Sequence, residues 1–226
     1  MPQPNSVVAR PSVVFALISG VLMAVYLTLR PYGDVGGSAT LAAAEAFASP
    51  LWIASHLAGA TSLVALAALW AQVSTRWPRW AAIVGVAMVL PYYGAETFAL
   101  HEIGARALAG DTGVLDLVVA VRDHPVAMTL FGIGLVALAV AGIGAALWWR
   151  RDSAKMRAGD RGKLLPGGAL VPLAVVAALF LSQFFLPPAG RMVYGVVFAV
   201  AAVYAAMGLS GAMSAENAKE RSLSGR

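Results

Sequence analysis

Hydrophobic segments close to 20 residues long follow one another through almost the whole chain. A helix needs about 20 mostly apolar residues to cross the roughly 30 Å hydrocarbon core of a bilayer. Six segments meet or approach this length: about 12–29, 51–73, 81–104, 125–149, 169–186 and 192–214. They predict an all-α fold, a polytopic membrane bundle of six transmembrane helices that forms a single transmembrane domain over residues 1–226.

Composition supports a membrane chain, since 60% of the residues are hydrophobic and only 12% are charged. A soluble domain carries about 25% charged residues, because water must solvate its surface. The absence of cysteine excludes disulfides, iron–sulfur clusters and Cys-ligated zinc. The first apolar run is expected to be a retained helix, because no convincing small-residue cleavage site follows it.

Two segments between the predicted spans, Thr40–Ser49 and Val114–Asp123, are too short to cross a membrane and predict surface helices. The first, third and fifth spans each end in a Leu, a Pro, a Gly and a charged residue. Three tandem helical hairpins would produce this repeat, although chance in a chain with 23 Gly and 12 Pro explains it nearly as well.

Basic residues predict the orientation, because Lys and Arg favour loops on the cytoplasmic side. Of the 16 basic residues, 12 map to the side that holds both termini and four map to the other side. We therefore expect both termini in the cytoplasm and a multi-pass location in a cytoplasmic (inner) membrane, with the size of small bacterial permease subunits. The basic run Arg150–Lys163 is a topology signal, and we expect no nucleic-acid partner.

Acidic and imidazole groups gather toward the opposite side, so a polar site is expected to open outward. The predicted outer half of the bundle holds seven carboxylates and all three histidines: Asp34, Glu45, Glu96, Glu102, Asp111, Asp116, Asp123, His56, His101 and His124.

Glu96 is the first candidate, because it lies inside the third predicted span, where a carboxylate costs a few kcal/mol unless it faces the bundle or water. Pro91 removes a backbone donor and can open the helix nearby. Tyr92 lies one turn before Glu96 and is placed to donate to it. In the alternative interpretation, Glu96 is hydrated at the membrane interface and has no function.

His56 reaches a similar depth from the second span, and further polar residues join it. The predicted site contains His56, Tyr92, Tyr93, Glu96, His101, Glu102, Gln183, Arg191 and Tyr194. Each residue taken alone fits an ordinary role at a helix cap, at the interface or in a buried hydrogen bond. Their shared depth is what favours a ligand site, with His56 or Arg191 as the partner that compensates Glu96.

Several cofactor chemistries fit the residues poorly. Retinal needs a lysine inside a helix, and all three lysines map to cytoplasmic segments. A zinc hydrolase motif needs a second histidine four residues from the first, and a nucleotide site needs a Gly-rich phosphate loop. A b-type haem would need His56 and His101 to face each other, and one of them lies too shallow. We therefore expect no cofactor and no metal.

Three functions remain open. The leading hypothesis is binding or passage of a small lipophilic or cationic molecule through an outward pocket centred on Glu96 and His56. The second is a membrane enzyme acting on a lipid or isoprenoid substrate, with Glu96 as proton donor and His56 in the catalytic site. The third is a structural subunit that packs against a membrane-protein partner or a second copy of itself, with membrane lipids around it.

Reporter fusions test the predicted topology. Fusions after Thr40, Leu115 and Ala189 are expected to be extracytoplasmic, and fusions after Trp77, Arg157 and Glu220 cytoplasmic, because the charge asymmetry and the hydropathy agree. A cytoplasmic signal from the connection 103–124 would contradict the six-helix topology and the outward position of the predicted site.

Overall fold

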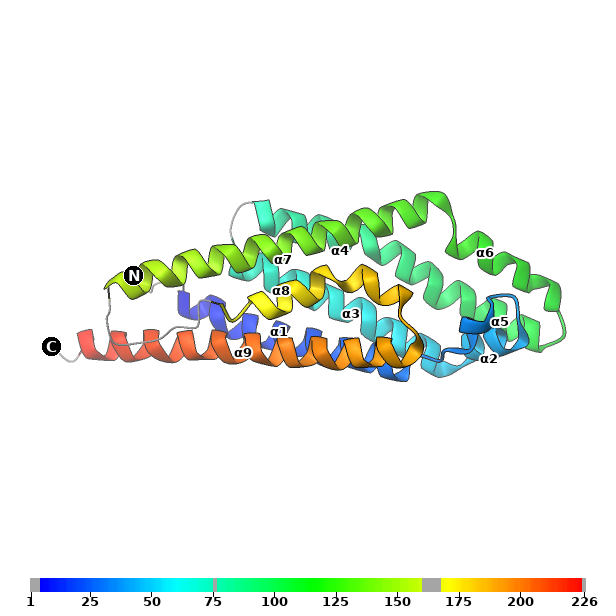
Figure 1. Ribbon diagram of the computed structural model, residues 1–226, viewed down its shortest axis with the longest axis horizontal. Coiled ribbons are helices and arrows are strands. Elements are labelled where there is room, and N and C mark those ends of the chain that lie inside the picture. The colour runs from blue at the N-terminus through cyan, green and yellow to red at the C-terminus, as the bar shows by residue number, and fades with distance from the viewer. Residues whose placement is uncertain (1–4, 75–76, 160–167, 225–226) are drawn as a thin grey trace.

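In a computed structural model, the chain is an elongated bundle of helices (Figure 1). The structure describes residues 5–74, 77–159 and 168–224, and these contain no strand. In chain order the elements are α1 (Asn5–Leu29), η1 (Gly33–Gly36), α2 (Leu41–Ala48), α3 (Pro50–Val73), α4 (Trp77–Gly94), η2 (Ala95–Ala99), α5 (Leu100–Leu108), η3 (Thr112–Asp116), α6 (Leu117–Arg122), α7 (Pro125–Gly159), α8 (Val171–Ala178), η4 (Phe180–Phe185) and α9 (Pro188–Ser224). The all-helical prediction is confirmed.

Five stretches of the described chain are long and apolar enough to cross a membrane. They are Pro11–Leu29, Pro50–Val73, Trp77–Leu108, Pro125–Ser153 and Pro188–Gly211. Four of the six predicted spans thus keep nearly their predicted bounds, and the third extends into a continuous rod of α4, η2 and α5. At 1.5 Å per residue, the 32 residues of this rod reach about 48 Å, which exceeds the hydrocarbon thickness. Its α5 end therefore projects beyond the apolar bundle.

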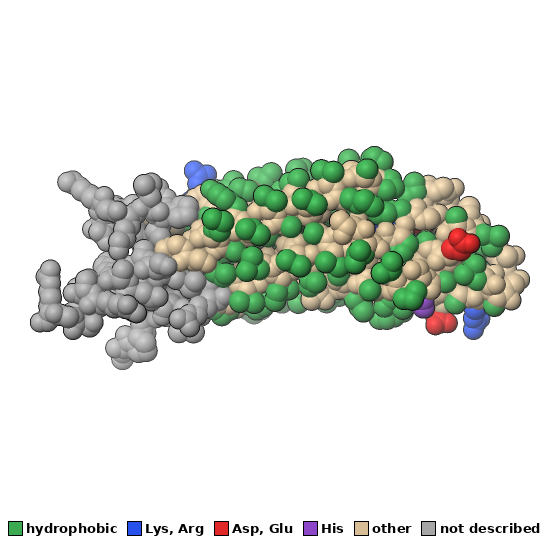
Figure 2. All heavy atoms as spheres, turned by 90° about the horizontal axis from the view of Figure 1, so that it is seen from below, with side chains coloured by type: hydrophobic (Ala, Val, Ile, Leu, Met, Phe, Trp, Pro, Cys, Tyr) green, Lys and Arg blue, Asp and Glu red, His purple; other side chains and the backbone are tan. Residues whose placement is uncertain are grey.

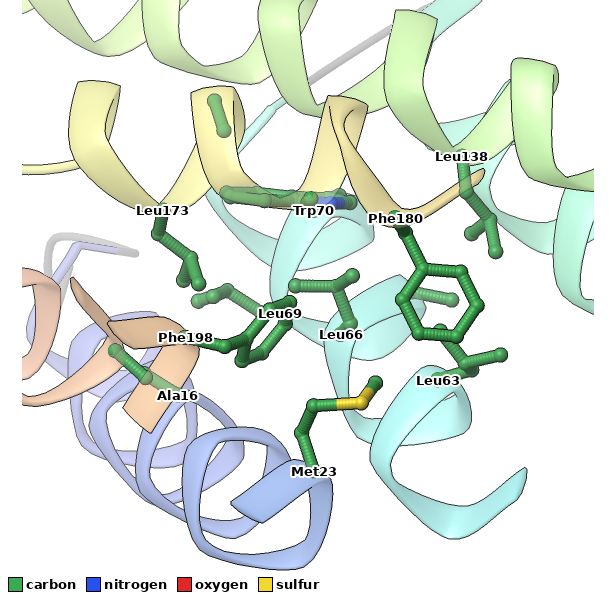
Figure 3. Close-up of a cluster of buried hydrophobic side chains, with 14 of the residues drawn as sticks. Ala16, Met23, Leu63, Leu66, Leu69, Trp70, Leu138, Leu173, Phe180 and Phe198 are labelled. Carbon is green, nitrogen blue, oxygen red and sulfur yellow. The ribbon is translucent and has the colours of Figure 1, made fainter. Parts of the chain in front are cut away.

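The fifth predicted span, 169–186, is not one long helix, so the six-helix count is not confirmed. The segment divides into α8, with eight residues, and η4, a 3₁₀ helix with six. A 3₁₀ helix repeats every three residues, which places Phe180 and Gln183 on one face, and both are buried. Figure 3 shows Phe180 directed into the same core as Met23 and Leu63. Packing of this face accounts for the change from α-helix to 3₁₀ helix.

The main core lies between antiparallel helices: α1 packs against α3 and α9, and α4 packs against α7. Large side chains such as Trp70, Phe198 and Met23 fill the centre (Figure 3). Close approach of α4 and α7 depends on Gly85 and Gly134, because a Cβ on Gly134 would lie 2.7 Å from the Gly85 carbonyl oxygen. Small residues at helix contacts are typical of membrane bundles.

A second, smaller hydrophobic cluster lies at one end of the bundle. The first described residues of α1 and the last of α9 lie at the other end (Figure 1). We call α2, α5, η3 and α6 the cap, and this end of the bundle the cap end. The two predicted surface helices fall here, as α2 and as η3 with α6. Thr40 begins α2 by accepting a hydrogen bond from the Ala43 amide at 3.1 Å. Gly104 lets α5 reach α2, since a Cβ there would lie 2.7 Å from the Ala44 carbonyl oxygen.

The outer surface of the bundle is apolar. Figure 2 shows hydrophobic side chains over the middle of one face and acidic, basic and histidine side chains toward the cap end. Val200 and Met207 on α9 are 64% and 67% exposed, which a water-soluble surface would disfavour. The apolar helices therefore indicate a membrane protein. Arg161 and Lys163 of the predicted basic run lie outside the described residues.

A pair of glycine substitutions tests the contact between α4 and α7. Gly134→Ala is expected to lower the free energy of unfolding by about 1–3 kcal/mol, because the added methyl group meets backbone atoms that cannot move independently. Gly132→Ala is the control, since a Cβ at Gly132 has no neighbour within 4 Å. Thermal unfolding in detergent measures both, and equal melting of the two variants would contradict this helix contact.

Candidate functional site

Four charged side chains meet at the cap end and are almost entirely buried. We call Arg30, Asp34, Glu96 and Arg122 the charged cluster. Arg30 forms a bidentate pair with Asp34, with Nη1 3.2 Å from Oδ1 and Nη2 2.7 Å from Oδ2. Arg122 joins both carboxylates, with Nη2 2.8 Å from Asp34 Oδ2 and 3.0 Å from Glu96 Oε1. Exposed fractions of the side chains run from 5% for Arg30 to 17% for Arg122, so water hardly screens these ion pairs.

The charged cluster draws one residue from each of four chain segments. Arg30 follows the end of α1, and Asp34 lies four residues later in η1. η1 packs directly on α2, because a Cβ on Gly33 would clash with the Ala42 carbonyl oxygen. Glu96 comes from η2 and Arg122 from the last residue of α6. The cluster therefore fastens the cap to the membrane bundle.

η2 is a π-helical turn, in which each amide bonds five residues back along the chain. Such turns are frequent at functional sites, and this one carries Glu96. The Thr97 hydroxyl donates to the Tyr93 carbonyl at 2.6 Å, which helps to satisfy the disturbed backbone. The helix remains continuous through Pro91, so the predicted opening takes the form of this turn, four residues beyond the proline.

Trp52 connects the charged cluster to the bundle. Its indole Nε1 donates to the Glu96 carbonyl at 3.1 Å. The guanidinium carbons of Arg30 and Arg122 lie 4.9 and 5.7 Å from its ring centroid, within the range of cation–π attraction. Phe47 supports the same Arg122 guanidinium from 5.2 Å. One aromatic side chain thus contacts both cations and the backbone of one anion.

His56 lies one turn deeper than Trp52 on α3 and is fully buried. Its Nδ1 lies 2.7 Å from the Trp52 carbonyl oxygen. Because a carbonyl oxygen can only accept, Nδ1 carries a proton, and in the neutral imidazole Nε2 is then an acceptor. Nε2 is buried and has no hydrogen-bond partner among the described residues.

Aromatic rings surround this imidazole. The centroids of Trp52, Tyr26 and Tyr93 lie 4.1, 5.4 and 6.5 Å from that of His56. His101 is not among them, since it belongs to the cap and its Nδ1 lies 2.9 Å from the Phe47 carbonyl oxygen. The paired imidazoles of a b-type haem are therefore not found in the described structure. Among the described residues there is also no group of three or more His, Cys, Asp or Glu side chains placed to bind a metal.

The remaining predicted site residues serve other contacts. Tyr92 packs on Phe131 with a centroid distance of 4.5 Å, and the described chain shows no hydrogen bond from it to Glu96. Glu102 is exposed on α5. Tyr194 donates to the Val176 carbonyl of α8 at 2.6 Å. Tyr92 and Tyr194 therefore support the packing of the bundle, and Glu102 takes no part in the charged cluster.

Arg191, which the sequence suggested together with His56 as a partner for Glu96, makes other contacts. Its Nε and Nη2 donate to the carbonyls of Leu186 and Phe184 at 2.9 and 2.6 Å, and it thereby closes the end of η4. The charged partner of Glu96 is Arg122, at the end of α6. Gln183 is buried in η4 with both polar side-chain atoms unpaired among the described residues.

Of the residues that meet at this end of the bundle, the sequence singled out Glu96, His56 and Tyr93 as site candidates but not Arg30, Asp34, Arg122 or Trp52. One signal was present for the arginines. Arg30, Arg106, Arg122 and Arg191 are the four basic residues that the charge asymmetry of the sequence assigns to the predicted outer side, which positive charge is expected to avoid. Three of these four make the specific contacts described above. An arginine on the disfavoured side of a membrane chain is a candidate for such a role.

Ion pairing controls the charge state at Asp34, which lies outside the membrane-spanning helices. Burial opposes ionisation of this carboxyl group. The charges of Arg30 and Arg122, with the hydrogen bonds that both donate, outweigh burial and lower the pKa of Asp34. Burial likewise opposes the charge on Arg122, but Glu96 and Asp34 raise its pKa overall. With two formal charges of each sign, the charged cluster is neutral as a whole.

Comparisons of this chain with known protein families, with curated proteins and with solved structures find no match. The chemistry of the cap end is therefore what points to a function.

Removing one member of the charged cluster should destabilise the cap. Arg122→Gln is expected to lower the free energy of unfolding by about 3–5 kcal/mol, because Glu96 remains buried without a counter-charge. Adding Glu96→Gln removes that charge and should recover part of the loss. Arg106→Gln, on an exposed position of α5, is the control. If Arg122→Gln melts with Arg106→Gln, the ion pairs do not hold the cap.

Proposed function

We propose that the chain binds a small lipophilic cation with an N–H group, in a site that His56 and Glu96 share at the cap end. The observation that carries this proposal is the His56 Nε2 acceptor, buried without a partner beneath a cluster of buried charges. Buried polar atoms are nearly always hydrogen-bonded, so an unpaired one calls for a partner. An N–H donor from a ligand is such a partner.

The surroundings of His56 suit a cation with an apolar body. Tyr26, Trp52 and Tyr93 present rings around the imidazole, and aromatic faces attract cations. Glu96 supplies the opposite charge, and the Trp52 indole ties its backbone to this aromatic group. An ammonium that reaches Glu96 competes with the Arg122 guanidinium for the same carboxylate oxygen. The charged cluster thus closes the site, and a ligand cation opens it by replacing Arg122 as the partner of Glu96.

The proposal includes an orientation. We infer that the chain lies in the cytoplasmic (inner) membrane, that the cap end faces outward and that both termini face the cytoplasm. The asymmetry of basic residues supports this orientation. The start of α1 and the end of α9 also lie at the same end of the bundle, as two cytoplasmic termini require (Figure 1). In this topology α8 and η4 together form the sixth crossing. Binding would then occur from the outer side, with passage across the bundle as an extension of it.

The two other functions draw less support from the site. As an enzymatic proton donor, Glu96 would first have to leave Arg122, whose Nε and Nη2 both contact Oε1. As a subunit contact, the charged cluster would have to reach a partner chain, yet its side chains are at most 17% exposed. Ligand binding requires only the exchange of one cation for another.

Matched amines test the function. We expect the purified protein in nanodiscs to bind N,N-dimethylbenzylamine, which is protonated at neutral pH, about tenfold more tightly than benzyltrimethylammonium. The two probes share charge and shape, but only the first donates an N–H to His56 Nε2, a charged hydrogen bond of about 1.5–3 kcal/mol. His56→Phe should abolish the preference, and His124→Phe, at an exposed histidine, should keep it. Equal binding of both amines by the unmodified protein, or no binding of either, would contradict the proposal.

A further inference from the structure

A large apolar groove lies between α8 and α9, away from the charged cluster. Its volume is 1040 Å³, above the range of about 300–1,000 Å³ that is usual for small-molecule sites. Its walls include Val175 and Val176 of α8 with Val197, Val200 and Tyr204 of α9. Arg150, near the cytoplasmic end of the apolar part of α7 in the proposed topology, is the charged residue among the described lining.

The groove runs along α8, where its lining extends from Gly168 to Val176, before the chain turns inward at Phe180. The valines that remain along α8 and α9 are branched at Cβ, so each has one stiff, short side chain that cannot extend into the space. Val175 and Val200 stay 52% and 64% exposed as a result. The fold therefore leaves a gap that faces the membrane.

The lining fits an amphiphile with a long apolar part and one anionic end. Val175, Val197 and Val200 offer the apolar part an extended surface without polar groups. Arg150 is exposed and belongs to the end of the bundle where the described part of α1 starts and that of α9 stops (Figure 1). A guanidinium binds phosphate through two parallel hydrogen bonds, which gives it a preference for phosphate esters. Charge complementarity thus favours a lipid with a net negative headgroup over a zwitterionic lipid, which carries its own ammonium.

We propose that the groove between α8 and α9 is a binding site for an anionic phospholipid, with its acyl chain along the valines and its phosphate on Arg150. The lipid fills the gap beside α8 and holds this short helix against α9. This inference does not depend on the proposed amine site, which lies at the cap end.

Native mass spectrometry of the full chain, titrated with phosphatidylglycerol or phosphatidylcholine, tests the site. We expect one saturable phosphatidylglycerol per chain, bound at least tenfold more tightly than phosphatidylcholine. Arg150→Gln should reduce this preference to about twofold or less. Arg151→Gln is the matched control, because Arg151 is the next residue on α7, equally charged and exposed, and is not part of the described lining.

A second pair of variants locates the acyl chain. Val200→Trp fills the groove and should weaken binding of both lipids at least tenfold, whereas Val196→Trp, at an exposed position of the same helix outside the described lining, should not. Melting curves of all four variants check that each is folded. Equal binding of the two lipids, an equal effect of Arg150→Gln and Arg151→Gln, or full binding by Val200→Trp would each overturn the proposal.

Discussion

The cap end of this protein depends on one guanidinium that serves two carboxylates. Arg122 lies 88 residues after Asp34 in the chain and contacts both Asp34 and Glu96 with the same Nη2 atom. Breaking such a buried arrangement leaves a charge without a partner, which is far more destabilising than the loss of an exposed ion pair. The positions of η1, η2 and α6 are therefore linked, because Arg122 of α6 contacts Asp34 of η1 and Glu96 of η2 at once.

Trp52 extends this link into the bundle. Its indole N–H bonds to the backbone of Glu96, its ring contacts both guanidinium groups, and its carbonyl oxygen accepts from His56. The last of these contacts fixes the tautomer of the imidazole and so determines that Nε2 is the free acceptor. A change in the charged cluster thus has a direct route, through one side chain and its backbone, to the position of His56. In the proposed function, these contacts would couple binding at His56 to the closure of the cap.

Hydropathy predicted much of the fold, because about 20 apolar residues in a row have few alternatives to a spanning helix. It overestimated 169–186, where the packing of Phe180 and Gln183 favoured a 3₁₀ helix that no local pattern indicates. Glu96 was predictable from its place in an apolar segment. Its partner was not, because Arg122 reaches it only through the path of the cap, which depends on contacts such as that of Gly104 with α2. The sequence suggested His56 or Arg191 instead, and Arg191 donates to the carbonyls of Leu186 and Phe184.

The central claim is that the charged cluster closes the cap end over His56, and thiol accessibility tests it most directly. The chain has no cysteine, so Ser55→Cys, a buried position beside His56, introduces a single thiol. A membrane-impermeant methanethiosulfonate reagent is applied from the outer side to this variant and to the same variant with Arg122→Gln and Glu96→Gln. The closed cap predicts slow labelling with the ion pairs intact and at least tenfold faster labelling without them, with both proteins folded by melting. Equal rates in the two proteins would show that the charged cluster does not control access to His56.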